Sequence, residues 1–246
     1  MFVKTNQIIF FIIITLTKII SAEAYFDLSE NNIKIKTDFN GKEVIIFGIL
    51  NDDQETLVTI KGPEKNALIQ KKERILGFWF NTKKVTYNKI PTIFFIASSK
   101  NIEDILPDST IIKEELNFDF LLENKLSKRN FISDLSLDNW KDNFVKIKKD
   151  KGLFKEYKVE KIENKLFQTR IFFPAESIPG DYKVNVYQIK NNIILNNKEK
   201  IISLKKSGIG NQIYTFANNN AAAYGFFTII FAVLSGFIAA TLFRRS

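Results

Sequence analysis

The residues best suited to bind a ligand or a partner lie in one run, from position 71 to position 81. The run opens with Lys71-Lys72-Glu73-Arg74 and passes through apolar residues to Trp79-Phe80-Asn81. Cationic side chains donate hydrogen bonds to an oxyanion or to a carboxylate, and an indole ring stacks on a cation. The candidate binding residues are Lys71, Lys72, Glu73, Arg74, Trp79 and Asn81. The alternative interpretation of this run is a solvated hairpin flank followed by a core strand.

The sequence offers little for catalysis. It contains no cysteine and no histidine, which excludes disulfides, thiol nucleophiles, Ser-His triads and zinc or haem ligated by these residues. Ser98-Ser99-Lys100 brings hydroxyls near a lysine, but neighbours in sequence do not face one another and no nucleophile-elbow glycines surround them. We therefore predict no catalytic residue, no metal site, no cofactor and no enzymatic activity. The remaining enzymatic alternative is a carboxylate-based hydrolase of cell-wall glycan, which needs two carboxyl groups about 5 to 10 Å apart in a cleft.

The first 24 residues predict a secretory signal peptide. Lys4 supplies the positive start, Ile8 to Thr17 form the apolar segment, and Ala22-Glu23-Ala24 fits a cleavage site. Lys18 ends the apolar run after ten residues, whereas a membrane span needs about 20. A cleaved signal is therefore favoured over an uncleaved anchor, and Tyr25 is the expected start of the mature chain.

The other end of the chain predicts one transmembrane helix over residues 221–243. This stretch has no charged residue, and at about 1.5 Å per residue it covers a hydrocarbon core of about 30 Å. Arg244 and Arg245 in the tail, residues 244–246, place the C-terminus in the cytoplasm by the positive-inside rule, with Tyr224 near the opposite interface. We expect a single-pass protein with its body exported.

Small residues recur every four positions within this span, at Ala232, Gly236 and Ala240. Such a face lets another helix approach closely, so these three residues are candidates for contact with a partner helix or with a second copy of the chain. The alternative is that small residues are simply common in membrane helices.

The exported body is predicted to be mainly β. Short apolar or alternating runs between residues 25 and 100, punctuated by Asn40-Gly41 and Gly62-Pro63, predict a first immunoglobulin-like antiparallel sandwich module. Residues 101–157 predict a short helical connecting region that contains an amphipathic helix from Asp138 to Lys151. This helix packs its aromatic stripe on the sandwich or, alternatively, lies on a phospholipid surface.

Strand patterns resume over residues 158–206 and predict a second sandwich module. Asn191-Asn192 predicts a hairpin turn, and Gly180-x-Tyr182-x-Val184 is typical of the tyrosine corner of immunoglobulin-like domains. Phe172 and Val184 are expected to point into the core. Residues 207–220 are expected to be a polar linker without a fold of its own.

The formal charge of +9 comes from lysines spread along the chain, with 36 Lys+Arg against 27 Asp+Glu. No Lys/Arg block is present, so we do not expect a nucleic-acid partner.

The chain also resembles a family of single-pass transmembrane proteins of alphaproteobacteria whose function is uncharacterised. The resemblance spans nearly the whole mature chain and rests on ordered short motifs: Asp27-Leu28-Ser29, Ile33, Ile35, Phe47-Gly48, Gly62-Pro63, Lys71-Lys72-Glu73-Arg74, Gly77, Trp79-Phe80-Asn81, Ala97-Ser98-Ser99, Phe173-Pro174-Ala175, Pro179-Gly180-x-Tyr182, Tyr224-Gly225 and Phe243-Arg244-Arg245. The many lysine, isoleucine and asparagine residues depart from the Arg-rich and Ala-rich chains typical of that family. The resemblance implies a protein of the bacterial inner membrane with its body in the periplasm. It also implies a permease similar to sulfite exporters as the partner, which the protein would serve as an accessory or ligand-binding subunit.

Overall fold

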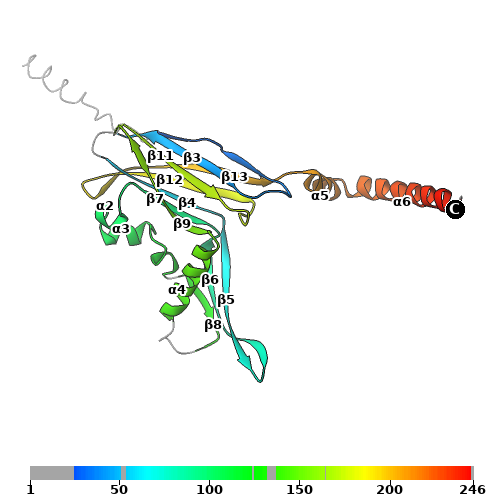
Figure 1. Cartoon of the computed structure of the whole chain (residues 1–246), viewed down its shortest axis with the longest axis horizontal. Helices are drawn as coiled ribbons and strands as arrows, with labels where there is room; N and C mark the ends of the chain where they lie inside the picture. Colours follow the sequence, from blue (N-terminus) through cyan, green and yellow to red (C-terminus); the bar gives the residue numbers. More distant parts are fainter. Residues whose placement is uncertain (1–24, 51–53, 124, 132–136, 164, 245–246) are drawn as a thin grey trace, which may run out of the picture.

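The computed structural model describes residues 25–50, 54–123, 125–131, 137–163 and 165–244. The predicted signal peptide and Arg245 of the predicted tail lie outside the described residues. Figure 1 shows a body of β-sheets with short helices on one side, and two further helices that leave one end of the body. The prediction of a mainly β protein with one C-terminal apolar helix is confirmed.

The elements follow one another as a long series of strands interrupted by one helical region. The strands are β1 (Phe26–Leu28), β2 (Asn32–Ile35), β3 (Lys42–Ile49), β4 (Glu55–Lys61), β5 (Glu64–Ile75), β6 (Phe78–Pro91), β7 (Phe94–Ser98), β8 (Leu126–Arg129), β9 (Phe154–Lys158), β10 (Glu160–Ile162), β11 (Leu166–Phe173), β12 (Gly180–Lys190) and β13 (Ile193–Lys206). The helices are α2 (Ile102–Ile105), α3 (Asp108–Lys113), the 3-10 helix η1 (Phe120–Leu122), α4 (Leu137–Asp150), α5 (Ile209–Asn219) and α6 (Ala221–Phe243).

The described strands form three sheets. A four-stranded sheet has the order β1-β3-β11-β10, and a six-stranded sheet has the order β2-β13-β12-β4-β7-β9. These two sheets bury a shared core between them, to which β3, β11, β12 and β13 all contribute apolar side chains. The third sheet, β5-β6-β8, is built on a long hairpin that projects from the sandwich.

The strand pairing corrects the division into two modules. β3 of the first predicted module is hydrogen bonded to β11 of the second, and β4 is hydrogen bonded to β12. The pairs β2–β13 and β7–β9 are parallel, so the sandwich is not wholly antiparallel. Grouping strands by sequence follows the tendency of consecutive strands to be neighbours, but here the sheets join distant segments. The strands of residues 25–100 and 158–206 therefore form one sandwich.

The helices of the region 101–157, predicted as a connection between modules, cover the outer face of the six-stranded sheet, while β8 and β9 of the same region are strands of two sheets. Phe118, Trp140 and Phe144 are buried there against side chains of that sheet, including Phe94. The rings of Phe94 and Phe118 meet edge to face at 5.3 Å between centroids. Because β4 and β7 are covered on both faces, all but their end residues are buried, whereas the first half of β12 alternates between buried and exposed residues.

Helix α4 confirms the amphipathic helix predicted from Asp138 to Lys151, within one residue at each end. Its aromatic stripe packs on the body, since Trp140 and Phe144 are buried and the rings of Phe144 and Phe154 lie 6.0 Å apart. The interpretation of this helix as packed on the sandwich is confirmed. The phospholipid-surface alternative is wrong, because the apolar face is occupied by the protein.

Of the two side chains predicted to point into the core, one is confirmed and one is wrong. Val184 is fully buried. Nearby, the Tyr182 hydroxyl donates a 2.8 Å hydrogen bond to the carbonyl of Ile178. Phe172, however, is 44% exposed, while its neighbours Ile171 and Phe173 are buried. Side chains alternate along a strand, so a run of three apolar residues leaves open which of them point inward.

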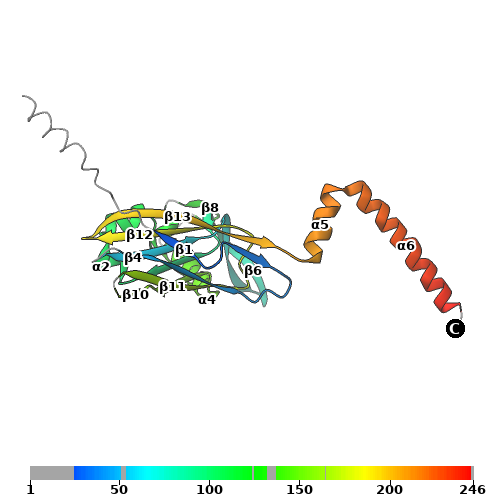
Figure 2. The same cartoon turned by 90° about the horizontal axis from the view of Figure 1, so that it is seen from above.

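Residues 207–220 also differ from the expectation of an unfolded linker. Helix α5 occupies most of this segment and is followed after Asn220 by α6, at an angle visible in Figure 2. Helix α6 spans residues 221–243, the range predicted for the transmembrane helix, and none of its residues is buried by the body.

Candidate functional site

The predicted binding run forms the outer end of the β5–β6 hairpin, which we call the hairpin tip and define as residues 71–84. Ile75 pairs with Phe78, so Leu76 and Gly77 form a two-residue turn. Both turn residues have positive φ, 51° at Leu76 and 88° at Gly77, as a type I′ turn requires. Figure 1 shows the hairpin extending away from the sandwich, in a direction different from that of α6.

Leu76 is an unusual residue for its place in this turn. Positive φ favours Asn, Asp or Gly, because other side chains crowd the backbone there. The hairpin between β12 and β13 follows that preference, with Asn191 and Asn192 at φ values of 52° and 62°. Leu76 combines an unfavourable backbone conformation with a side chain that is 95% exposed. An outlier of this kind is a reason to look for a function at the same place.

Four of the predicted site residues share one face of the hairpin tip. Directly paired residues of an antiparallel ladder lie on the same face, and alternate residues along each strand do so as well. Trp79 pairs with Arg74, and Asn81 pairs with Lys72. The Arg74 Nε also donates a 3.2 Å hydrogen bond to the carbonyl of Gly77, which ties the guanidinium to the turn. This face therefore presents an indole ring beside two cationic side chains and an amide.

The opposite face of the tip is mainly apolar. It carries Ile75 paired with Phe78, and Glu73 paired with Phe80. Glu73 forms an ion pair with Lys71 at 2.7 Å, and the hydrogen bond from Lys71 lowers the pKa of the Glu73 carboxyl group. Lys71 and Glu73 thus neutralise one another, and apolar side chains dominate this face.

The apolar residues of the tip are not core residues. Leu76 is 95% exposed, Phe78 70% and Trp79 68%, and Ile75 and Phe80 are also about half exposed. The alternative interpretation of this run, a hairpin flank followed by a core strand, is therefore wrong for residues 78–80. Large apolar side chains gathered at one protruding point are typical of a surface that binds another molecule.

The sequence interpretation missed the residues that make this apolar surface. It singled out Trp79 but gave Leu76, Phe78 and Phe80 no role in binding, and its alternative placed the strand that carries Trp79 in the core. The signal that identifies them is Leu-Gly between two strand patterns, because a two-residue turn at that point places its apolar neighbours at the end of a hairpin. Lys83 and Lys84 were also missed, and both are exposed on the returning strand.

The second set of predicted site residues lies on α6. Ala232, Gly236 and Ala240 are exposed, and a Cβ built on Gly236 would meet no atom within 4 Å outside its own helix backbone. This small-residue face is open to another helix. Their contact with a partner remains a prediction.

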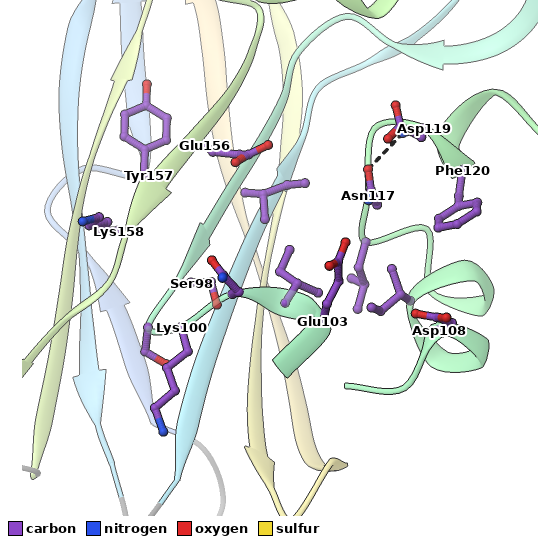
Figure 3. Close-up of a pocket in the computed structure, with 16 residues that line it drawn as sticks. Ser98, Lys100, Glu103, Asp108, Asn117, Asp119, Phe120, Glu156, Tyr157 and Lys158 are labelled. Carbon is purple, nitrogen blue, oxygen red and sulfur yellow. Dashed lines mark hydrogen bonds between the residues drawn. The ribbon is translucent and has the colours of Figure 1, made fainter. Parts of the chain in front are cut away.

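A hydrolase would need a cleft, and the body has a concave surface that encloses a volume of about 1160 Å³ (Figure 3). It lies between the ends of β7 and β9 and the helices that follow β7. The carboxyl groups on its wall come from four segments of the chain and belong to Glu103, Asp108, Asp119 and Glu156, which are labelled in Figure 3. Asp119 is further tied to the local turn, since its amide donates a 3.0 Å hydrogen bond to the Asn117 side chain.

A polar cluster beside this concave surface is structural in character. The Glu55 carboxylate accepts hydrogen bonds from Ser99 at 2.6 Å, Lys161 at 2.7 Å and Lys100 at 3.0 Å. Partial burial opposes ionisation of Glu55, but the hydrogen bonds from Lys161, Ser99 and Lys100 outweigh it and lower the pKa to about 2. This carboxylate ties the end of β7 to β10. Among the described residues, no three acidic side chains converge as metal ligands.

The fold and the apolar helix define the class of protein. It is a β-sandwich protein with a single C-terminal helix suited to cross a membrane. Residues 23–245 match the family described as "Putative transmembrane protein" (Alph_Pro_TM), and the chain belongs to that family. The predicted family resemblance is thereby confirmed. A search of curated proteins returned no match.

Proposed function

We propose that the protein is a non-enzymatic accessory subunit that α6 anchors in the membrane and that binds another membrane protein through the hairpin tip. The observation that carries this proposal is the exposed apolar end of the hairpin, with Leu76 at a turn position that disfavours leucine. A solvent-exposed side chain of this kind contributes nothing to the core. The Leu76 side chain can contribute hydrophobic free energy only if a partner buries it.

The chemistry of the hairpin tip defines the surface that fits it. The tip carries five cationic side chains and one carboxylate, which leaves a net charge of +4 around its apolar end: Lys71, Lys72, Glu73, Arg74, Lys83 and Lys84. The complementary surface is an apolar recess bordered by carboxylates. Aromatic anchors in such a recess supply much of the binding free energy, while the rim charges set orientation and association rate.

The proposed location is the inner membrane of a bacterium, with the body in the periplasm and the C-terminus in the cytoplasm. Support comes from Arg244, which directly follows the span, and from the signal-like sequence at the N-terminus. A periplasmic reporter fused after Asn218 is expected to be active. Activity of a cytoplasmic reporter at the same junction would reject this orientation.

The candidate partner that follows from the family resemblance is a permease similar to sulfite exporters. An integral membrane partner agrees with two features of this chain, the open small-residue face of α6 and the exported hairpin tip. We propose that Ala232, Gly236 and Ala240 contact a helix of the partner, because backbones approach closely only where side chains are small.

The alternative, a carboxylate-based hydrolase, depends on the concave surface between β7 and β9. Such an enzyme needs two carboxyl groups placed about 5 to 10 Å apart on either side of the scissile bond. The variants Glu103→Gln and Glu156→Gln test this reading, because loss of a glycan-hydrolysing activity in either one would favour the enzyme over the accessory subunit.

The test of the proposal is affinity purification of the full-length protein in detergent, with identification of the proteins that accompany it. The double variant Phe78→Ser and Trp79→Ser is expected to lose the specific partner while its melting temperature stays unchanged. The matched control is Leu195→Ser, which removes another exposed apolar side chain of the body and should retain the partner.

A second arm separates the two proposed contacts. Gly236→Leu is expected to weaken the complex through the membrane helix, while Ile230→Ala and Phe237→Ala, which change residues off the small-residue face, should have less effect. If the hairpin variants and the Gly236 variant all retain every accompanying protein, the accessory-subunit proposal is wrong.

A further inference from the structure

We infer that α5 lies in the plane of the membrane surface, on the same side as the body, with its apolar face at the boundary between lipid headgroups and acyl chains. The inference rests on the membrane span and is independent of what the hairpin tip binds. It assigns a lipid contact to a segment that the sequence had indicated as a plain linker.

Apolar and polar side chains are separated around the axis of α5. At 3.6 residues per turn, the apolar and polar residues fall on opposite sides of the helix. The apolar side carries Ile213, Tyr214, Phe216 and Ala217. The polar side carries Gln212, Thr215, Asn218 and Asn219. A helix with this division is suited to a surface between an apolar and an aqueous phase.

The apolar side is not covered by the body. Ile213 is 50% exposed, Tyr214 69% and Phe216 38%. Within the part of the chain that the structure describes, the ring contacts recorded for α5 are those of Phe216, and both are with α6. An exposed apolar face of this kind is expected to contact another apolar surface. The position of α5 in the chain indicates that this surface is the membrane.

The position of α5 places it at the level of the headgroups. The 23 residues of α6 are about 34 Å long, which is enough to fill a hydrocarbon core of about 30 Å without help from α5. Asn220, at φ −133° and ψ 53°, breaks the helical path between the two helices, so α5 does not continue along the axis of α6 (Figure 2). Helix α5 therefore ends where the span begins.

Aromatic contacts hold α5 beside the first turns of the span. The ring of Phe216 lies 6.4 Å from the ring of Tyr224 and 6.4 Å from the ring of Phe227. Tyrosine is enriched at membrane interfaces, where its ring is apolar and its hydroxyl reaches water. These contacts place Ile213 and Tyr214 on a helix that is packed against the end of the span.

The charges near α5 agree with a lipid surface. From Ser207 to Phe243 there is no charged residue, so no ion has to be desolvated when α5 settles at the interface. Lys205 and Lys206, at the end of β13, come directly before this uncharged stretch. Cationic side chains at that level attract the phosphates of the headgroups.

The lipid contact would hold the body close to the membrane. Only Ser207 and Gly208 separate β13 from α5, so the end of β13 stays near the membrane surface once α5 is seated. The hairpin leaves the sandwich in a direction different from that of α6 (Figure 1). With α6 crossing the membrane, the hairpin tip would therefore extend across the membrane surface rather than straight away from it.

The test uses the absence of cysteine in the chain, which makes any introduced cysteine a unique labelling site. Single cysteines at positions 212 to 218 of the full-length protein carry a nitroxide label in nanodiscs that contain anionic phospholipid and no other protein. Labels at 213, 214 and 217 should be accessible to oxygen, which concentrates in lipid, and labels at 212, 215 and 218 to a water-soluble nickel chelate. We expect the two accessibilities to vary in opposite phase with the helical period.

Two double variants test whether the oxygen accessibility depends on the apolar face of α5. With the label at position 217, Ile213→Asn combined with Phe216→Asn should abolish the oxygen accessibility, because it removes the apolar face. The matched polar-face control, Gln212→Ser combined with Thr215→Ser, should leave it unchanged. Equal access of the nickel chelate to all positions would overturn the inference, since α5 would then lie in water. Low access of both reagents to the apolar positions would also overturn it, by showing that a second copy of the chain covers the face.

Discussion

Two aromatic-rich runs of this chain have nearly the same composition and opposite environments. Ile93 to Ala97 reads Ile-Phe-Phe-Ile-Ala, and every one of these residues is at most 2% exposed. Ile75 to Phe80 reads Ile-Leu-Gly-Phe-Trp-Phe, and its large side chains are between 47% and 95% exposed. The first run lies between β4 and β9 in a sheet covered on both faces, whereas the second forms the end of a hairpin with nothing packed over it.

The difference shows that an apolar strand pattern reports a tendency to be buried and does not name the molecule that buries it. In the sandwich the covering groups belong to the same chain: Phe95 meets the rings of Tyr157 and Phe173 at 5.6 and 5.8 Å. At the hairpin tip we propose that they belong to a partner. If so, the same change of an aromatic or aliphatic residue should affect folding in one region and binding in the other.

The largest expected effect is the contrast between Val184→Asp and Phe78→Asp. Val184 is fully buried in the sandwich, so an aspartate there places an unpaired charge in the core and costs several kcal/mol, out of a total of about 5 to 15. Phe78→Asp changes an exposed residue and should alter the free energy of unfolding by less than about 0.5 kcal/mol. Urea unfolding of the detergent-solubilised protein, followed by near-ultraviolet circular dichroism, measures both. If the two variants unfold at the same urea concentration, the proposed difference between the core and the hairpin tip is wrong.

The next effect concerns Glu55, which ties β4 to the end of the buried strand β7. Its pKa falls from an ordinary 4.5 to about 2 in the folded protein, so the ionised form stabilises the fold above pH 4.5, and this stability is lost as the pH falls from 4.5 towards 2. After allowance for solvent screening we expect a contribution of about 2 kcal/mol. Glu55→Gln should lower stability by that amount at neutral pH and flatten the pH dependence in this window. A variant that keeps the full acid dependence of the parent protein would show that other carboxyl groups are responsible.

A smaller effect is expected from Tyr182→Phe. The ring stays packed against Phe173 at 5.4 Å, while the hydrogen bond to the Ile178 carbonyl is lost, which costs about 1 kcal/mol. Thermal unfolding measures this loss, and the exposed control Tyr25→Phe should melt like the parent protein. A loss of several kcal/mol would mean that the hydroxyl is needed to form the corner itself.

An effect of similar size but opposite sign, confined to the hairpin tip, is expected from Leu76→Asn. Asparagine accepts positive φ more readily than leucine, so the hairpin tip should gain about 1 kcal/mol of local stability, a roughly fivefold increase in amide exchange protection. The same variant should bind the partner less well, because the most exposed apolar side chain is gone. Unchanged partner retention together with higher protection would show that the unfavourable leucine has no binding role.

The predictions from sequence were most accurate where the determinants are local. The turn at Asn191-Asn192 and the helix α4 depend on residues a few positions apart, and both were found where the sequence placed them. The apolar span 221–243 is equally local, because length and the absence of charge are sufficient to define it. The pairing of Arg74 with Trp79 also depends on one short turn, but that turn was not predicted.

The tertiary structure decided what depends on distant segments. Hydrogen bonds between strands are alike for any partner, so no local pattern fixed β3 against β11 or merged the two predicted modules into one sandwich. In the same way, Phe172 and Phe173 have the same side chain, and only the sheet that covers one face decides that Phe173 is buried. The hairpin tip is the clearest case: the sequence determined that residues 75–80 are apolar, and the tertiary structure determined that no part of the sandwich covers them, because burial is a property of what surrounds a strand.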